Sequence, residues 1–303
     1  MQQDMKKKVI AGLVIGVVIL SMIFAALAEK SATGSRSVAA GGGKVAVIYL
    51  NGAMSAGQSG DFWSSGSSGE GVIADLRRAA NSPDIKAVVL RLDSPGGTPV
   101  SAQEIANEIE RVQDSGKVVV ASMGDTAASA AYWVAAVTDR IVANPGTLTG
   151  SIGVIMETAN LQKLFESYGV SMDAIKSGPY KDIGSYARAV TPEERAILQS
   201  IVDDIFEQFI EAVAQGRGME TEQVRQLADG RVFTGRQALG LGLVDQLGDL
   251  QDAITLAGEM AGIEGEPAVV NYSGGNIWSS LIRGAMEDII IDAATYRLDY
   301  NIR

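Results

Sequence analysis

Apolar and polar residues follow one another in blocks that predict a membrane helix and then an α/β domain. Residues 9–28 contain no charged side chain, and a helix that rises about 1.5 Å per residue over such a run spans a hydrocarbon core of about 30 Å. Lys6, Lys7 and Lys8 precede the run, and the positive-inside rule then keeps residues 1–8 in the cytoplasm. We therefore expect a single-pass cell-membrane protein that contacts the lipid bilayer through residues 9–28 and holds its folded domain outside the cytoplasm.

Two other interpretations of this run are open. Ala26, Leu27 and Ala28 resemble a signal-peptide cleavage site, so the segment is alternatively a cleaved signal peptide, although the apolar core of such a peptide usually has about 7–15 residues. A buried core helix is the third interpretation, but the run is apolar on every side, whereas a helix at the surface of a core has one polar face.

Beyond a small-residue, glycine-rich linker at 29–43, short apolar runs alternate with amphipathic ones. This alternation is typical of βαβ units and a mostly parallel sheet. The expected strands are 44–50, 87–92, 117–122, 151–156 and 171–176, and the expected helices are 72–80, 101–114, 126–137 and 192–216. We therefore predict an α/β domain over residues 44–265, followed by a C-terminal helical segment over 266–303 in which 277–300 have amphipathic spacing.

The composition narrows the chemistry that this domain can carry out. The chain has no histidine and no cysteine, which excludes a Ser-His-Asp triad, a thiolate nucleophile and the usual zinc sites. Its formal net charge of −11 argues against nucleic acid as a partner. The acidic pair Glu193 and Glu194 on the longest expected helix reads as part of a solvated face.

Two stretches carry candidate chemistry. The first is Leu-Asp-Ser-Pro-Gly-Gly-Thr at 92–98, at the carboxyl end of an expected strand, where ligands of open α/β sheets bind. Its glycines leave backbone N–H groups uncovered, as an oxyanion hole requires, although a tight turn is the simpler explanation. The second, at 123–132, follows the next strand and holds Ser129 between alanines, which leaves the hydroxyl accessible. A small residue chosen for close packing is the alternative there.

Together these two stretches resemble the Clp protease/crotonase superfold. Three more stretches, at 148–156, 175–182 and 228–238, are similar to the SppA-type signal peptide peptidases, and the resemblance runs from about residue 44 to residue 252. It implies a Clp/crotonase-like layered βαβ superfold preceded by one N-terminal transmembrane helix. The chain carries one set of these motifs, as the short form of the family does, and the resemblance implies neither a metal ion nor a cofactor.

The resemblance also implies a Ser/Lys dyad. Ser129 matches the nucleophile of the family, Lys181 matches its general base, and Ser151 matches the position whose hydroxyl orients the lysine amine. The backbone N–H groups of Gly97 and Ala130 match the oxyanion hole. Alanines follow Ser129 where family members often have Gly-Gly, which keeps the N–H groups but adds methyl groups that narrow the groove.

A lysine base agrees with the absence of histidine. At pH 7 only about one ordinary lysine in 2,000 is neutral, and burial away from carboxylates lowers the pKa of a lysine. Asp182 follows Lys181 and opposes a neutral amine, unless the two side chains face opposite ways as neighbours in an extended segment do.

The resemblance implies a membrane-anchored serine endopeptidase that degrades remnant signal peptides or other apolar peptides. Members of this family assemble into homo-oligomeric rings, with active sites between neighbouring subunits in the shorter forms, so Ser129 and Lys181 come either from one subunit or from two. The alternatives are a crotonase-like acyl-CoA enzyme, another membrane protease of the superfold that cuts membrane-protein tails, and a non-catalytic membrane scaffold.

Overall fold

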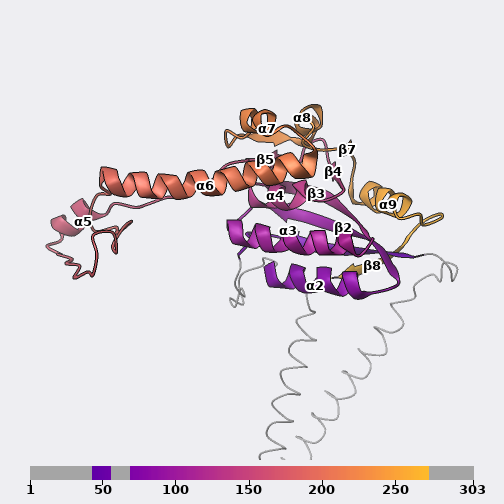
Figure 1. Ribbon diagram of the computed structural model, residues 1–303, viewed down its shortest axis with the longest axis horizontal. Coiled ribbons are helices and arrows are strands. Elements are labelled where there is room, and N and C mark those ends of the chain that lie inside the picture. The colour runs from indigo at the N-terminus through magenta and orange to yellow at the C-terminus, as the bar shows by residue number, and fades with distance from the viewer. Residues whose placement is uncertain (1–42, 56–68, 273–303) are drawn as a thin grey trace, which may run out of the picture. The chain divides into compact units, whose positions relative to one another are not determined.

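A computed structural model describes residues 43–55 and 69–272 of the chain, which belong to one unit, Gly42–Arg303. Strands and helices alternate in the part described (Figure 1). The strands are β1 (Lys44–Asn51), β2 (Ile85–Ser94), β3 (Val118–Ala128), β4 (Arg140–Ala143), β5 (Leu148–Gly150), β6 (Val232–Thr234), β7 (Gln246–Leu247) and β8 (Ala268–Tyr272). The helices are α2 (Gly69–Asn81), α3 (Pro99–Asp114), α4 (Ala130–Ala136), α5 (Gln162–Ser167), α6 (Pro192–Arg217), α7 (Thr221–Leu227), α8 (Gly235–Gly240) and α9 (Leu250–Met260).

The strands form one sheet in the order β6-β5-β3-β2-β1-β8, and β4 pairs with β3 and β7 beside this path. Every pair is parallel except β5 with β6. Parallel neighbours need helical crossovers, and α2 and α3 provide them between β1, β2 and β3. The α/β prediction is confirmed for the described residues.

Helices cover both faces of the sheet, which explains why its central strands are apolar at consecutive positions. On β1, Ala46 and Ile48 belong to the core cluster shared with α2, α3, α4 and α6. Val45 and Val47 belong to the cluster that α9 covers on the other face. All four side chains are fully buried, so the carboxyl ends of β2 and β3 are held rigidly where the candidate motifs begin.

The expected helices 72–80, 101–114 and 192–216 are confirmed as α2, α3 and α6. Both α3 and α6 begin with a proline in the first turn, after a threonine whose hydroxyl accepts a backbone N–H. Proline is tolerated there because the first N–H groups of a helix have no intrahelical acceptor. The sequence therefore fixes the starts of these two helices through their capping residues.

Two expected strands are wrong. Residues 151–156 and 171–176 are neither helical nor extended into a sheet. Ile152 is buried in the core, but other apolar side chains that suggested strands there are exposed, among them Ile155 and Ile175. A strand needs a hydrogen-bonding partner as well as apolar residues, and at this edge of the sheet β6 already pairs with β5.

Two other expectations need correction at their boundaries. The helix expected over 126–137 begins only at Ala130, because residues 126–128 continue β3 and pair with β5. The segment 266–303, expected to be helical, begins with β8, which lies parallel to β1. A short strand on the edge of a sheet leaves little signal in the sequence, since the partner strand decides whether it forms.

The run 9–28, most of the linker 29–43 and the amphipathic run 277–300 lie outside the described residues. Among the helices that the structure describes, none combines the length and the apolar character that crossing a membrane requires. The membrane helix therefore stays a prediction.

Residues 157–191, which we call the arm, directly precede α6 in the chain. The carboxyl-terminal half of α6 packs on α4 through Phe209, Ile210 and Val213, which are buried. Its amino-terminal half runs away from the sheet, and α5 lies near that far end (Figure 1). Thr191 caps this end of α6 through a capping box with Glu194, so the arm is joined to a well-formed helix start.

Candidate active site

Ser129 occupies a sharp turn between β3 and α4. Its backbone has a φ of 56° and a ψ of −125°, a left-handed conformation that is uncommon outside glycine and often found at functional sites. Its N–H donates to the carbonyl of Gly150 at 2.9 Å, and its carbonyl accepts from the N–H of Trp133 at 3.0 Å. The side chain makes no capping hydrogen bond. A strand-turn-helix geometry thus presents the hydroxyl as a nucleophile elbow does, although the Gly-x-Ser-x-Gly sequence is absent.

The Pro-Gly-Gly turn after β2 lies directly against Ser129. Gly96 has a φ of +105°, and a Cβ there would lie 2.8 Å from the Ser129 Cβ and 2.9 Å from the Ala130 nitrogen. A Cβ on Gly97 would lie 2.0 Å from the Met54 carbonyl oxygen. Both positions therefore require glycine, because a side chain at Gly96 would collide with Ser129 and one at Gly97 would collide with the Met54 backbone.

Two backbone N–H groups are available next to Ser129. Gly97 pairs with Met54 in a parallel bridge, in which Met54 donates to Gly96 and Thr98 donates to Met54. In that pattern the N–H of Gly97 itself points away from Met54. Ala130 is the first residue of α4, and the first N–H groups of a helix have no acceptor within it. The geometry is that of two donors fixed before any charge develops.

Ser129, Gly97 and Ala130 line one pocket with a volume of about 120 Å³. Its other walls are mostly apolar. The rings of Trp133 and Phe209 stack at 4.8 Å between their centroids, and both line the pocket. The remaining wall residues are Pro99, Gly153, Val154 and Ile155. Such a pocket suits a small apolar side chain beside the serine hydroxyl.

Ser151 is held close to Ser129 through the backbone. It follows Gly150, whose carbonyl accepts the Ser129 N–H. Its own φ is 51°, and its N–H donates to the carbonyl of Arg231 at 2.8 Å. The structure therefore brings four of the predicted site residues together: Ser129, Ser151, Gly97 and Ala130.

Lys181 lies elsewhere. It is exposed and lies in a turn in which its N–H donates to the carbonyl of Gly178. It is not among the residues that line the serine pocket. The next residue, Asp182, is bound by Arg188, which also binds Glu194 at the start of α6. Fifteen helical residues separate Glu194 from Phe209 at the pocket, which is about 22 Å at 1.5 Å per residue. No lysine side chain spans that separation within one chain.

The arm is held at the start of α6 by a network of charges that the sequence analysis missed. The Arg188 guanidinium donates to both oxygens of Asp182 at 2.9 and 3.0 Å and to both oxygens of Glu194 at 2.5 and 2.8 Å. The hydrogen bonds from Arg188, and then from Lys176, lower the pKa of Asp182. Those from Arg188, and then from the Thr191 N–H, lower the pKa of Glu194 to about 2.

Glu194 was expected on a solvated face, and that expectation is wrong. Its side chain is only 3 % exposed, because Arg188 covers it. Arg188 lies six residues before Glu194 and outside the helix. Helical spacing compares residues of one helix only, so it does not indicate this partner. Trp133 and Phe209 were also missed as pocket walls, because stacking between α4 and α6 joins residues far apart in the sequence.

A comparison of the chain with known protein families identifies its family. The model of peptidase family S49 matches residues 111–264. The chain belongs to peptidase family S49. The match spans β3, the Ser129 turn, the arm and α6. The similarity to SppA-type peptidases that the sequence indicated is thereby confirmed.

Relatives agree with this assignment. A protein of Synechocystis sp. named as a candidate protease is 50% identical over 178 residues, which are 59% of this chain and 64% of that protein. A protein of Enterococcus faecium named as a candidate signal peptide peptidase, SppA, is 35% identical over 212 residues, 70% of this chain and 62% of that protein. The matches thus span less than two thirds of each of these two relatives.

A solved structure shares the fold. A membrane-bound stomatin-specific protease superposes with a TM-score of 0.51 at 15% identity, over 78% of this chain and all of that chain. At this identity the likeness concerns the fold alone. It supports the layered α/β architecture that the sequence predicted.

Proposed function

We propose that this S49 member is a membrane-anchored serine endopeptidase that degrades remnant signal peptides or other apolar peptides at the membrane. Ser129 is the nucleophile, Lys181 is the general base, and Ser151 orients the lysine amine. The observation that carries the proposal is the convergence of Ser129 with the N–H groups of Gly97 and Ala130 on one apolar pocket. Residues 9–28 would anchor the catalytic domain on the extracytoplasmic side, where apolar h-regions are within its reach.

The reaction follows the ordinary course of acyl transfer. The neutral amine of Lys181 takes the proton from the Ser129 hydroxyl as its oxygen attacks the peptide carbonyl carbon. The resulting oxyanion accepts hydrogen bonds from Gly97 and Ala130. The C–N bond then breaks, and the Lys181 ammonium gives its proton to the leaving amine. Water attacks the ester carbonyl carbon, and Lys181 takes a proton from that water. The ester C–O bond then breaks, and Lys181 gives this proton to the Ser129 oxygen.

In this proposal Lys181 comes from a neighbouring copy of the chain. The separation of about 22 Å along α6 supports this, because proton transfer needs hydrogen-bond distance. The apolar surface around the arm supports it as well. Within the arm, Tyr168 is 78 % exposed and Met172 is 52 % exposed, and exposed apolar side chains gathered on one segment are typical of surfaces that another protein covers. A homo-oligomeric ring would place the arm of one copy over the serine pocket of the next.

The test is activity and labelling of the full chain in detergent or membranes. Ser129→Ala and Lys181→Ala should abolish cleavage of an apolar fluorogenic peptide, and Ser129→Ala should abolish labelling by a fluorophosphonate. Ser200→Ala on α6 and Lys86→Ala on β2 are matched controls, because both residues are exposed, outside the pocket and outside the arm. Full activity in Ser129→Ala or Lys181→Ala contradicts the dyad, and absence of both cleavage and labelling in the wild type contradicts the serine protease.

A further inference from the structure

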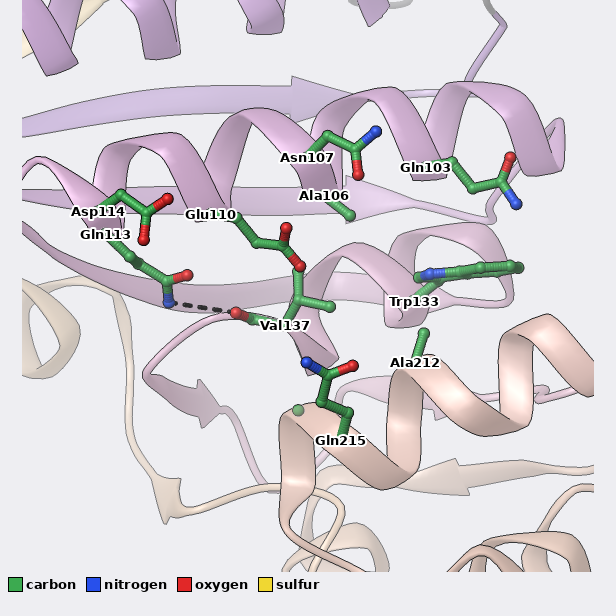
Figure 2. Close-up of a pocket in the computed structure, with 11 residues that line it drawn as sticks. Gln103, Ala106, Asn107, Glu110, Gln113, Asp114, Trp133, Val137, Ala212 and Gln215 are labelled. Atoms are coloured by element: carbon green, nitrogen blue, oxygen red, sulfur yellow. Dashed lines mark hydrogen bonds between the residues drawn. The ribbon is translucent and has the colours of Figure 1, made fainter.

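A second cavity lies between α3 and α6, next to the Ser129 pocket, and we call it the α3–α6 groove (Figure 2). Its volume is about 490 Å³, against about 120 Å³ for the serine pocket. One wall comes from α3 and the other from α6, while Trp133 of α4 and Val137, which follows α4, lie between them. Nothing in the mechanism above uses this groove.

The groove is negatively charged. Glu110 and Asp114 lie one turn apart on α3 and line it together with amide side chains such as Gln103 and Asn107. Neither carboxylate forms an ion pair with another described residue, and no lysine or arginine is among the described lining residues. Like charges four residues apart on a helix repel each other, so a cation in the groove would relieve this repulsion.

The rest of the lining suits the stem of a basic side chain. Trp133 and Val137 present apolar surface beneath the polar wall. Lysine and arginine side chains lie with their methylene groups on such surface and their charge in polar surroundings. The chemistry of the groove therefore matches a basic side chain, with its charged end near Glu110 and Asp114.

The groove adjoins the site of the proposed chemistry. Trp133 lines both cavities, and Pro99 and Phe209 of the serine pocket lie on the same two helices that form the groove walls. Eleven residues of α3 separate Pro99 from Glu110, which is about 16 Å. An extended peptide advances about 3.3 Å per residue, so this length corresponds to about five residues.

We propose that the α3–α6 groove is a substrate subsite that binds a lysine or arginine side chain of the peptide, about five residues from the bond that Ser129 cleaves. This inference rests on the proposed peptidase function and names its substrate class. A signal peptide has a basic n-region next to its apolar h-region. The groove would hold the n-region while the h-region is cut at Ser129.

The test compares two apolar fluorogenic peptides that differ at one position, five residues from the cleaved bond, where one has lysine and the other norleucine. The variant is Glu110→Gln/Asp114→Asn. Its control is Glu104→Gln/Glu211→Gln, which removes two charges from exposed positions of α3 and α6 outside the groove. We expect the wild type and the control to prefer the lysine peptide by about three- to tenfold in kcat/KM, the range for one or two solvent-exposed ion pairs. The ratio should fall toward one in Glu110→Gln/Asp114→Asn, and in the wild type at high salt.

A binding measurement separates this inference from the proposed function. Fluorescence anisotropy of the labelled lysine peptide on Ser129→Ala protein needs no cleavage. Binding that weakens with Glu110→Gln/Asp114→Asn supports the subsite, even if the wild type cleaves neither peptide and the peptidase proposal fails. Equal peptide ratios and equal binding in the two charge variants overturn the subsite. So does a change of oligomer size in size-exclusion chromatography with no change in ratio or binding, because the groove would then be a contact between copies of the chain.

Discussion

Mixing two inactive variants tests whether Lys181 acts on the serine of another copy. The Ser129→Ala variant keeps the lysine, and the Lys181→Ala variant keeps the serine. If each site takes its two residues from neighbouring copies, a site is intact only where the copy with the serine lies next to the copy with the lysine. In a random equal mixture half of the copies carry the serine, and half of their neighbours carry the lysine. About a quarter of wild-type activity should therefore return. If both residues come from one copy, none returns.

The structure sets the size of this effect. Phe209 lines the serine pocket, whereas Lys181 lies beside Asp182, which Arg188 ties to Glu194 at the start of α6. The intervening helix is about 22 Å long, and a general base must come within about 3 Å of the proton it takes. We therefore expect no contribution from a lysine in the same chain, and the whole recovery should come from mixed neighbours.

The assay uses full chains that carry two different affinity tags, so that tandem purification selects mixed oligomers. Activity is measured on an apolar fluorogenic peptide and divided by that of a wild-type oligomer carrying the same two tags. Two differently tagged copies of Ser129→Ala provide the control, which should be inactive at every ratio. Mixed oligomers of Ser129→Ala with Lys181→Ala that form but show no activity would refute the reasoning.

Three further changes have expected outcomes. Gly97→Ala would bring a Cβ to 2.0 Å from a backbone oxygen and displace an oxyanion donor, so kcat should fall by about 10²–10³-fold while circular dichroism stays close to wild type. Phe209→Ala removes the ring stacked on Trp133 and should lower the free energy of unfolding by about 3–5 kcal/mol in a denaturant titration. The pKa of Glu194 is lowered to about 2, so its link to Arg188 is complete above the ordinary carboxyl pKa and is lost as the pH falls toward 2. Exchange of the backbone amide hydrogens of residues 176–194 should therefore be slow at pH 5 in wild type and fast in Arg188→Met. Equal exchange rates in the two proteins would contradict the network.

The parts of the fold that could be predicted from sequence are those whose signals are local. The runs that became β1 and β2 are apolar at consecutive positions because helices cover both faces, and the starts of α3 and α6 have a proline after a capping threonine. The strands expected at 151–156 and 171–176 are wrong because apolar residues indicate that a segment tends to be buried, but they do not indicate which partner buries it. Exposed Ile155 and Ile175 now indicate surfaces that a single chain leaves uncovered.

The same limit applies to the site. Ser129, Gly97 and Ala130 follow the carboxyl ends of adjacent parallel strands, so their meeting could be expected from the topology of the sheet. The left-handed backbone of Ser129 could not, because its φ of 56° is imposed by the hydrogen bond to Gly150 and by the approach of Gly96. Nor could the sequence place Lys181, since its position depends on the length and direction of α6.

The arm network answers a difficulty that the sequence raised about the lysine base. A carboxylate at Asp182 with no other partner would pair with the adjacent Lys181 and draw its amine away from a serine hydroxyl. In the structure one oxygen of Asp182 accepts from Lys176 at 2.5 Å and from Arg188 at 2.9 Å, and Arg188 also binds the other oxygen. Two cations thus already engage this carboxylate, so in the proposed mechanism the arm would bring Lys181 to a neighbouring serine pocket without its own counter-ion. On this reasoning Arg188→Met leaves Lys176 as the partner of Asp182 and makes the second carboxylate oxygen available to Lys181, so kcat should fall more than KM rises. Adding Asp182→Asn to Arg188→Met should restore part of that kcat, an outcome that a purely structural role for the network would not produce.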